Sequence, residues 1–235
     1  MNDLKVLAID TSSFPASAAI AEDGVMLGEY VIRNKRKHSQ NIMVMVERLF
    51  DDLELDISDI DVFAATVGPG SFTGLRIGIA TVRAFAQACG KKCVAVNTLE
   101  ALAYNFVCSG LKVVSMLDAR RDEVFAAVYV FMGNEMCEIQ EPCVMTVSEC
   151  LEEFGTEGVI YAGDGALKNA DAIRGAGGII APCSHSETRA ASAAALAMER
   201  ARNGGAADYG SIKPLYLRKS QAEREYEKKA RKSAE

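Results

Sequence analysis

Short apolar runs alternate with longer amphipathic segments through the first half of the chain. Runs such as Leu4–Asp10 are brief, mostly apolar and bounded by turn residues, which is typical of buried strands. His38–Leu55 instead repeats its apolar residues with the period of an α-helix. The first half is therefore predicted to run β-β-β-α-β-α-β-α, with strands at Leu4–Asp10, Ala16–Ala21, Val25–Ile32, Asp61–Val67 and Cys93–Val96 and helices at His38–Leu55, Thr73–Cys89 and Thr98–Val107.

The same order begins again near Leu111. Lys112–Asp118 is a predicted strand that ends on an aspartate, as Leu4–Asp10 does. Two passes of one order predict a duplicated α/β architecture, in which the second pass is degenerate between residues 167 and 186. The expected lobes span residues 1–107 and 108–217, followed by a charged tail at 218–235. The other expected elements are strands at Glu123–Met132, Glu135–Thr146, Val159–Ala162 and Lys213–Leu217 and helices at Val147–Phe154 and Ala190–Asn203.

Two of the predicted helices carry more apolar surface than one sheet can cover. In His38–Leu55 an apolar stripe fits the chain's own sheet, but Val44 and Met45 fall on the opposite side. In Thr73–Cys89 the polar residues are confined to one narrow stripe of Arg76, Arg83 and Gln87. Either the protein covers both faces of these helices itself, in three layers, or the surplus surface docks on another subunit.

Composition and charge narrow the class of protein. The 235 residues are 49% hydrophobic and 25% charged, which is the balance of an ordinary folded protein of one or two domains. The longest apolar run is the nine residues Val124–Met132, too short to span a membrane. The first residues lack the basic and apolar regions of a signal peptide, so we expect a cytoplasmic protein.

The net charge is unevenly distributed. Its sum is 26 − 32 = −6, but residues 218–235 hold seven basic and four acidic side chains, or +3, which leaves −9 on the body. An acidic body does not suit direct tracking of a nucleic-acid backbone. The tail is expected to be a solvated end, and any nucleic-acid contact is expected to use the tail or a partner.

Cysteine and histidine usage gives no support for a metal site. The seven cysteines are odd in number and contain no C-x-x-C pair, so we expect reduced packing thiols. Two histidines, His38 and His185, are too few for a convincing metal cluster, and no nucleophile–base order stands out. The sequence therefore predicts no catalytic residue and no metal ligand.

The most distinctive segment is Gly68–Gly78, which joins a predicted strand to a helix N-terminus. Such a junction can bind an anion, or its glycines can serve a tight turn and close packing. It lacks the Lys-Ser/Thr of a phosphate-binding Walker loop. Asp10 and Asp118 end the first strands of the two halves and would face a metal–nucleotide, but no glycine follows either one. The weak candidates for a nucleotide site are Asp10, Thr11, Ser12, Gly68, Gly70, Ser71 and Asp118.

Several of these segments occur together in one known family. They are Asp10-Thr11-Ser12, His38-Ser39, Gly68–Gly78, Asn97–Leu102, Asp118–Phe125 and Pro214–Arg218. In this order they resemble the TsaB (YeaZ) family of bacterial tRNA threonylcarbamoyladenosine biosynthesis proteins. The resemblance is close over residues 4–125 and loose in the middle of the second half, and Gln40 stands where the family usually has Glu. It implies the two-lobed fold of actin-like ATPases, sugar kinases and heat-shock chaperones.

The resemblance also implies a role without chemistry of its own. The family partners a catalytic paralogue, TsaD, which attaches threonylcarbamoyl to the adenosine next to the anticodon of tRNA. The paralogue's two metal-binding histidines fall on Thr98 and Leu102 here, and neither can replace an imidazole ligand. The chain is therefore expected to be a scaffold or activator, with a kinase-like ATPase or a peptidase acting on the paralogue as alternatives.

Partners follow from the same resemblance. The first two helices are expected to pack against those of TsaD, or of a second copy when the chain is alone. A small ATPase, TsaE, is a further expected partner, with ATP or ADP possible between subunits and tRNA reached through the complex. The candidate docking residues are Met43, Val44, Met45, Phe50, Leu75, Arg76, Ile79, Val82 and Arg83.

Overall fold

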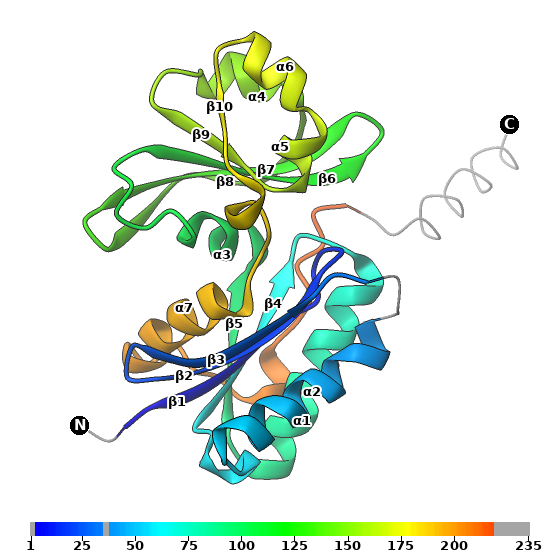
Figure 1. Cartoon of the computed structure of the whole chain (residues 1–235), viewed down its shortest axis with the longest axis vertical. Coiled ribbons are helices and arrows are strands. Elements are labelled where there is room, and N and C mark those ends of the chain that lie inside the picture. The colour runs from blue at the N-terminus through cyan, green and yellow to red at the C-terminus, as the bar shows by residue number, and fades with distance from the viewer. Residues whose placement is uncertain (1–2, 35–37, 219–235) are drawn as a thin grey trace, which may run out of the picture.

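The computed structural model describes residues 3–34 and 38–218 and divides them between two sheets (Figure 1). The first sheet has the strand order β3-β2-β1-β4-β5. Its central strand β1 runs antiparallel to β2 and parallel to β4, which in turn is parallel to β5. The strands are β1 (Lys5–Asp10), β2 (Ala16–Glu22), β3 (Val25–Ile32), β4 (Val62–Gly68) and β5 (Lys92–Asn97).

The second sheet repeats this topology. Its order, β8-β7-β6-β9-β10, has β6 in the place of β1, antiparallel to β7 and parallel to β9. The strands are β6 (Lys112–Arg120), β7 (Glu123–Met132), β8 (Glu135–Thr146), β9 (Val159–Ala162) and β10 (Ile179–Ile180). The predicted duplication of an α/β unit is therefore confirmed.

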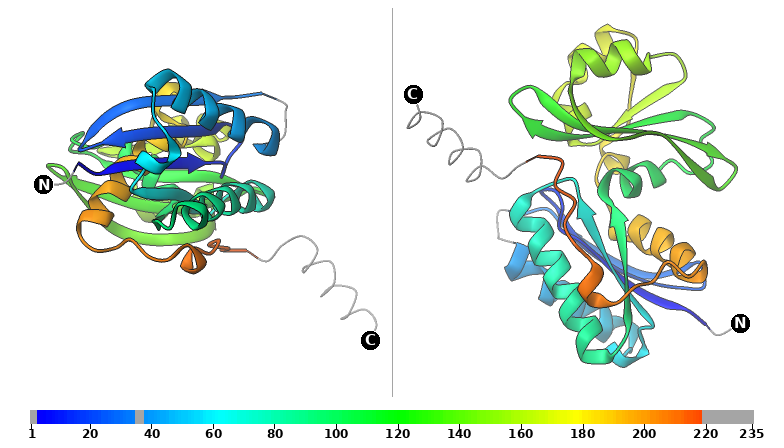
Figure 2. Two further views of the ribbon diagram at one scale, coloured as in Figure 1. Left: turned by 90° about the horizontal axis from the view of Figure 1, so that it is seen from below. Right: turned by 180° about the vertical axis from the view of Figure 1, so that it is seen from behind.

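Helices cover both faces of the first sheet (Figures 1 and 2). Because side chains alternate along β1, Leu7 and Ile9 join the core under α1 and α2, while Val6 and Ala8 join the core under α7. The helices are α1 (His38–Leu53), α2 (Phe72–Cys89), α3 (Thr98–Tyr104), α4 (Val147–Phe154), α5 (Asp164–Lys168), α6 (Ala170–Gly175) and α7 (Ala190–Arg202). Single-turn 3-10 segments lie at η1 (Ile57–Asp59), η2 (Cys183–His185) and η3 (Tyr209–Ser211).

Helix α7 differs in position from the sequence expectation. Its residues fall within the range 108–217 assigned to the second lobe, yet α7 packs on the first sheet. The physical reason is a match of small side chains, because Ala193 and Ala197 of α7 share one buried core with Ala8 and Ala64 of the sheet. The chain therefore crosses between the lobes twice, once into β6 and once from β10 into α7.

Other boundaries differ modestly. α1 ends at Leu53 and α3 at Tyr104, each earlier than predicted. The predicted strand Lys213–Leu217 is wrong as a strand, although the Leu215 N–H donates one hydrogen bond of 2.7 Å to the Val67 carbonyl of β4. Pro214 has no N–H to donate, which works against a regular ladder. Residues 219–235 of the predicted tail lie outside the described residues.

No helix within residues 3–34 and 38–218 has the length and apolar character needed to cross a membrane.

Candidate functional site

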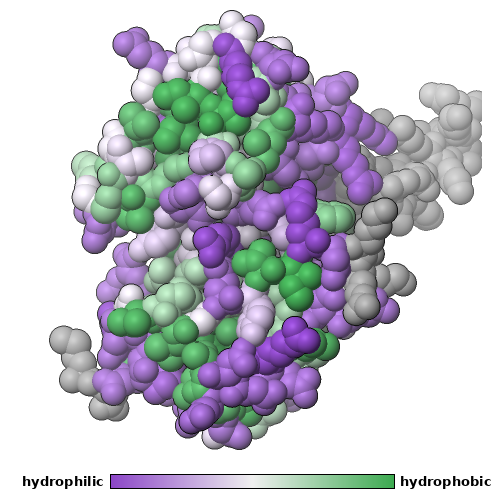
Figure 3. Space-filling view, in the orientation of Figure 1, coloured by the Kyte–Doolittle hydropathy of each residue, from purple (hydrophilic) through white to green (hydrophobic). Residues whose placement is uncertain are grey.

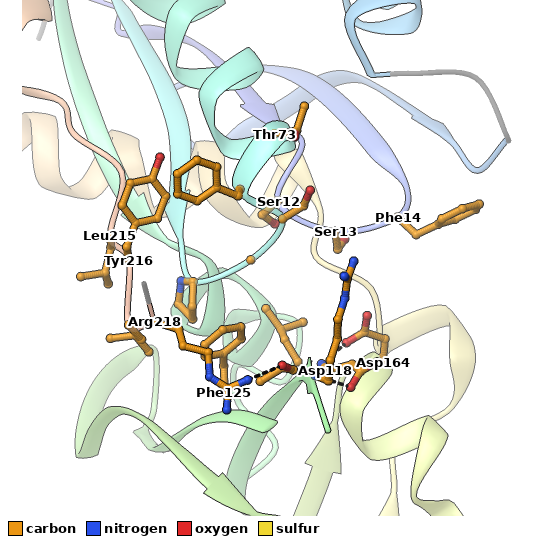
Figure 4. A pocket seen from close by; sticks show the side chains of 18 of the residues that line it. Ser12, Ser13, Phe14, Thr73, Asp118, Phe125, Asp164, Leu215, Tyr216 and Arg218 are labelled. Carbon is orange, nitrogen blue, oxygen red and sulfur yellow. Dashed lines mark hydrogen bonds between the residues drawn. The ribbon is translucent and has the colours of Figure 1, made fainter. Parts of the chain in front are cut away.

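A cavity of about 700 Å³ lies between the two lobes (Figure 4). The turn after β1 and the start of α2 form one wall, and β6 with its following turn forms the other. This is a size that a small molecule would fill. The lining residues are Ser12, Ser13, Phe14, His38, Pro69, Gly70, Ser71, Phe72, Thr73, Leu117, Asp118, Ala119, Arg120, Phe125, Asp164, Leu215, Tyr216, Leu217 and Arg218.

The glycine-rich segment serves close packing at the edge of this cavity. Ser71 is the N-cap of α2, where its hydroxyl accepts a 3.2 Å hydrogen bond from the Gly74 N–H. A Cβ at Gly74 would overlap the Thr11 carbonyl oxygen, and one at Gly78 would overlap the Thr11 hydroxyl. The glycines therefore let α2 lie directly on the turn after β1. Anion binding at this junction stays a prediction.

Asp10 is held inside the protein and does not face the cavity. It is fully buried, and its carboxylate accepts hydrogen bonds from the Ser12 N–H at 3.1 Å, the Ser12 hydroxyl at 2.6 Å and the Thr66 hydroxyl at 2.5 Å. The Thr188 hydroxyl donates a fourth at 2.7 Å. A carboxylate has about four acceptor positions. These residues therefore do not fit the metal–nucleotide that the actin-like fold implies.

The carboxylates of the second lobe are also engaged. Asp118 pairs with the Lys168 ammonium at 3.1 Å and accepts the Arg120 N–H at 2.9 Å. The Asp164 carboxylate accepts the Asp118 N–H at 2.9 Å. Burial, with the like charge of Asp118 adding to it, raises the pKa of Asp164, but the residue keeps an exposed surface, so solvent limits this effect.

Asp164 was not among the residues that the sequence singled out. The sequence does contain a pattern that could have identified Asp164, because this residue follows the predicted strand Val159–Ala162 and Gly163. A carboxylate after a strand at the sheet's carboxyl edge is the pattern that identified Asp10 and Asp118. The structure brings Asp118 and Asp164 to one wall of the cavity (Figure 4). Asp10 is not part of the lining and lies buried beneath Ser12, whose hydroxyl donates to it.

The two positions that would carry the paralogue's metal ligands are buried. Thr98 is fully buried and its hydroxyl has no hydrogen-bond partner among the described residues, and Leu102 lies in the core formed by α3, β6 and β7. An alkyl side chain offers no donor to a metal ion. Across the described part of the chain, no group of three or more His, Cys, Asp or Glu residues could hold a metal ion.

The surfaces of α1 and α2 separate the candidate docking residues into two sets. Met43 and Val44 are 50% and 44% exposed, Arg76 and Arg83 are exposed, and Phe50 is half-buried. The other four are buried in the chain's own core, which rules out their side chains as surface contacts. These four are Met45, Leu75, Ile79 and Val82.

The reason for this separation lies in how α2 is seated. Its bulky apolar side chains pack on the sheet and on α1. Its outer face is left with small residues at Ala80, Ala84 and Ala88 beside Arg76 and Arg83. We call the exposed Met43, Val44, Ala80, Arg83 and Ala84 the α1–α2 face. Exposed apolar residues also occur elsewhere on both lobes among hydrophilic ones (Figure 3).

Comparison with known proteins identifies the family. The family model described as "TsaD: tRNA N6-adenosine threonylcarbamoyltransferase" matches residues 26–226. The tRNA threonylcarbamoyladenosine biosynthesis protein TsaB of Bacillus subtilis is 27% identical over 225 residues, covering 94% of this chain and 96% of that protein. TsaB of Escherichia coli is 30% identical over 164 residues, covering 66% of this chain and 70% of that protein.

A solved structure supports the same family assignment. YeaZ from Pseudomonas aeruginosa superposes with a TM-score of 0.79 at 25% identity, covering 91% of this chain and 100% of that one. Together with the duplicated sheet order, this confirms the actin-like fold. The chain belongs to the family of the TsaD model and, within it, to the TsaB (YeaZ) proteins of tRNA threonylcarbamoyladenosine biosynthesis.

Proposed function

We propose that this chain is a non-catalytic scaffold and activator in the formation of threonylcarbamoyladenosine on tRNA. The observation that carries the proposal is the burial of Asp10, whose carboxylate is committed to four internal hydrogen bonds. In an actin-like enzyme a carboxylate at the end of this strand would face the nucleotide. Here Asp10 joins three separate segments of the chain through its hydrogen bonds to Ser12, Thr66 and Thr188, which supports a structural role.

The partner in this proposal is the metal-bearing paralogue TsaD, which docks on the α1–α2 face. Apart from Arg83, the exposed side chains there are small or apolar, so helices of a partner can approach closely. Met43 and Val44 supply apolar area that water covers in the isolated chain. The same face pairs with a second copy when the paralogue is absent.

The remaining partners belong to the assembled complex. TsaE joins near the subunit interface, ATP or ADP is held between subunits, and tRNA is reached through the complex. The net charge of −9 on the body outside residues 218–235 supports an indirect contact with tRNA.

Nucleoside mass spectrometry on tRNA from cells depleted of this chain tests the proposal. We expect threonylcarbamoyladenosine to disappear and to return with the unmodified chain but not with Val44→Glu, which puts a charge on the α1–α2 face. Ile139→Glu is the matched control, since Ile139 is 60% exposed on β8 at the edge of the second sheet, away from α1 and α2. Unchanged modified nucleoside after complete depletion would refute the role.

Neither alternative function is favoured by a specific arrangement. A kinase-like ATPase needs a carboxylate at the end of β1 that is exposed to the cleft, whereas Asp10 is fully buried. For a peptidase, the Ser184 hydroxyl lies 2.9 Å from Nδ1 of His185, but no carboxylate among the described residues hydrogen-bonds to this ring. Intact paralogue after long incubation with the chain would count against peptidase activity.

A further inference from the structure

The segment Pro214–Arg218 lies along one side of the cleft and contacts both lobes (Figure 4). On the first lobe the Leu215 N–H donates its 2.7 Å hydrogen bond to the Val67 carbonyl. The Leu215 carbonyl sits where a Cβ on Gly68 would have to be. Gly68 has a φ of 125°, so a side chain is excluded there both by its backbone conformation and by this close approach.

A stack of three side chains adds to this attachment. The Tyr216 ring lies parallel to that of Phe72, with centroids 4.4 Å apart and an angle of 21° between the planes. The Arg76 guanidinium lies 4.0 Å from the centroid of the same Phe72 ring, and its Nε donates a 3.0 Å hydrogen bond to the Tyr216 hydroxyl. Stacking and cation–π contacts of this kind are each favourable. The segment is thereby fixed to the first turn of α2.

The Arg218 side chain contacts the second lobe. Nη1 of Arg218 donates a 2.7 Å hydrogen bond to the Ala119 carbonyl of β6, and Nη2 pairs with the Glu123 carboxylate at the start of β7. The two side chains are only 21% and 35% exposed, so solvent screens the pair less than one on the open surface. A guanidinium suits this site because its fixed fork of donors serves two acceptors at once.

The β6–β7 turn, which Arg218 contacts, has an unusual backbone conformation. Arg120, the last residue of β6, and Arg121 and Asp122 of the turn into β7 have φ values of 63°, 58° and 61°. This left-handed conformation costs free energy in residues other than glycine. Such a conformation persists only when neighbouring contacts hold it. The Arg218 guanidinium supplies such contacts, one on each side of the turn.

The opposite side of the cleft is already closed by the two chain crossings. The Asn105 side chain, at the end of α3, donates hydrogen bonds of 3.1 Å and 2.9 Å to the carbonyls of His185 and Glu187 in the return crossing. Ser192 of α7 in turn donates to the Asn105 side-chain oxygen at 2.6 Å. The crossings are therefore tied to each other.

We propose that Pro214–Arg218 is a latch that holds the second lobe against α2 and sets the opening of the cleft. The latch is permanently fixed to the first lobe by Leu215 and Tyr216, and it releases from the second lobe at Arg218. Release frees the β6–β7 turn and lets the lobes separate, with the two crossings joined at Asn105 acting as the hinge. The proposal rests on these contacts alone and does not depend on the role in tRNA modification.

Distance measurements between spin labels on the two lobes of the full chain test the latch. The chain has seven cysteines, so thiol-directed labels would attach at many positions. The labels are therefore attached to a ketone-bearing amino acid that replaces the exposed Asp51 on α1 and the exposed Asp171 on α6. We expect Arg218→Ala to add a population at longer distance. Lys168→Ala is the matched control, since it removes an ion pair with Asp118 that lies wholly within the second lobe.

Two further variants separate the latch from general loosening. Glu123→Gln removes the charge that Arg218 meets, and Tyr216→Ala removes the stack on Phe72, and each is expected to lengthen the distances as Arg218→Ala does. Hydrogen exchange at residues 119–123 is expected to rise in all three. The proposal is overturned if Arg218→Ala leaves the distances unchanged, or if Lys168→Ala lengthens them equally.

Discussion

Asp10 and Thr188 are 178 positions apart in the chain, yet the Thr188 hydroxyl donates a 2.7 Å hydrogen bond to Oδ2 of Asp10. Asp10 ends the first strand of the first lobe, and Thr188 lies where the chain returns from the second lobe to α7. A carboxylate at the place where an actin-like enzyme would bind its nucleotide thus fastens the return crossing to the first sheet. The contact commits one oxygen of this carboxylate to a bond within the protein and ties the return crossing to β1.

Thr188→Val is expected to lower the free energy of unfolding by about 1.5–3 kcal/mol, the range for a hydrogen bond to a charged group. The substitution keeps the shape of the side chain but removes one of four donors to a fully buried carboxylate. Urea unfolding followed by circular dichroism measures the change. Thr73→Val, at an exposed position on α2, is the control and should change stability by no more than about 0.5 kcal/mol. Equal effects of the two substitutions would contradict the assigned contact.

The element order could be predicted because it depends on periodicity, which is local. Leu4–Asp10 and Lys112–Asp118 both read as buried strands ending on aspartate, and both occupy the centre of a sheet. The position of α7 could not be predicted in this way. Its alanine stripe fits any surface of small side chains, and nothing in Ala190–Arg202 specifies which of the two sheets offers one.

The site was harder to predict, for a related reason. A helix that is apolar on nearly every side, as Phe72–Cys89 is, gives no direction for its core face, so Val82 and Ala84 look alike in the sequence. In the structure Val82 is buried and Ala84 is exposed. Likewise, the hydrogen bonds to Asp10 come from Ser12, Thr66 and Thr188, and only the first is a neighbour in the chain.

Gly74→Ala is expected to destabilise the protein, although alanine is normally the better helix former by about 1 kcal/mol. The reason is steric, because the new Cβ would overlap the Thr11 carbonyl and force α2 away from the turn after β1. Overpacking of this kind typically costs about 1–3 kcal/mol. Gly175→Ala is the matched control, since a Cβ there meets open space, and its thermal midpoint should stay equal or rise. A Gly74→Ala protein as stable as the unmodified chain would refute the close approach.

Val44→Glu is expected to abolish association through the α1–α2 face while leaving the monomer folded, because Val44 is 44% exposed. Val82→Glu should behave differently. It places an unpaired charge in the core, where the cost is roughly 3–5 kcal/mol, so the monomer itself should unfold. Sedimentation analysis, with and without the paralogue, reports association, and thermal melting reports folding. Persistent association of a folded Val44→Glu protein would exclude this face as the interface.

Two buried thiols should make the protein less stable in alkali. Burial raises the pKa of Cys93 to about 11 and that of Cys150 to about 12, from an ordinary value of 9.0. In the unfolded chain both thiols lose their protons near pH 9, whereas the folded protein keeps them. The folded state therefore binds more protons between pH 9 and the folded pKa values, so the free energy of unfolding falls as pH rises through this window. The slope is at most about 1.4 kcal/mol per pH unit for each thiol.

Urea unfolding between pH 8 and pH 11 measures this slope, and the double variant Cys93→Ala, Cys150→Ala should show a smaller slope than the unmodified chain. The double variant Cys108→Ala, Cys183→Ala removes two exposed thiols and should keep the original slope, so an equal reduction in both double variants would show that burial is not the cause.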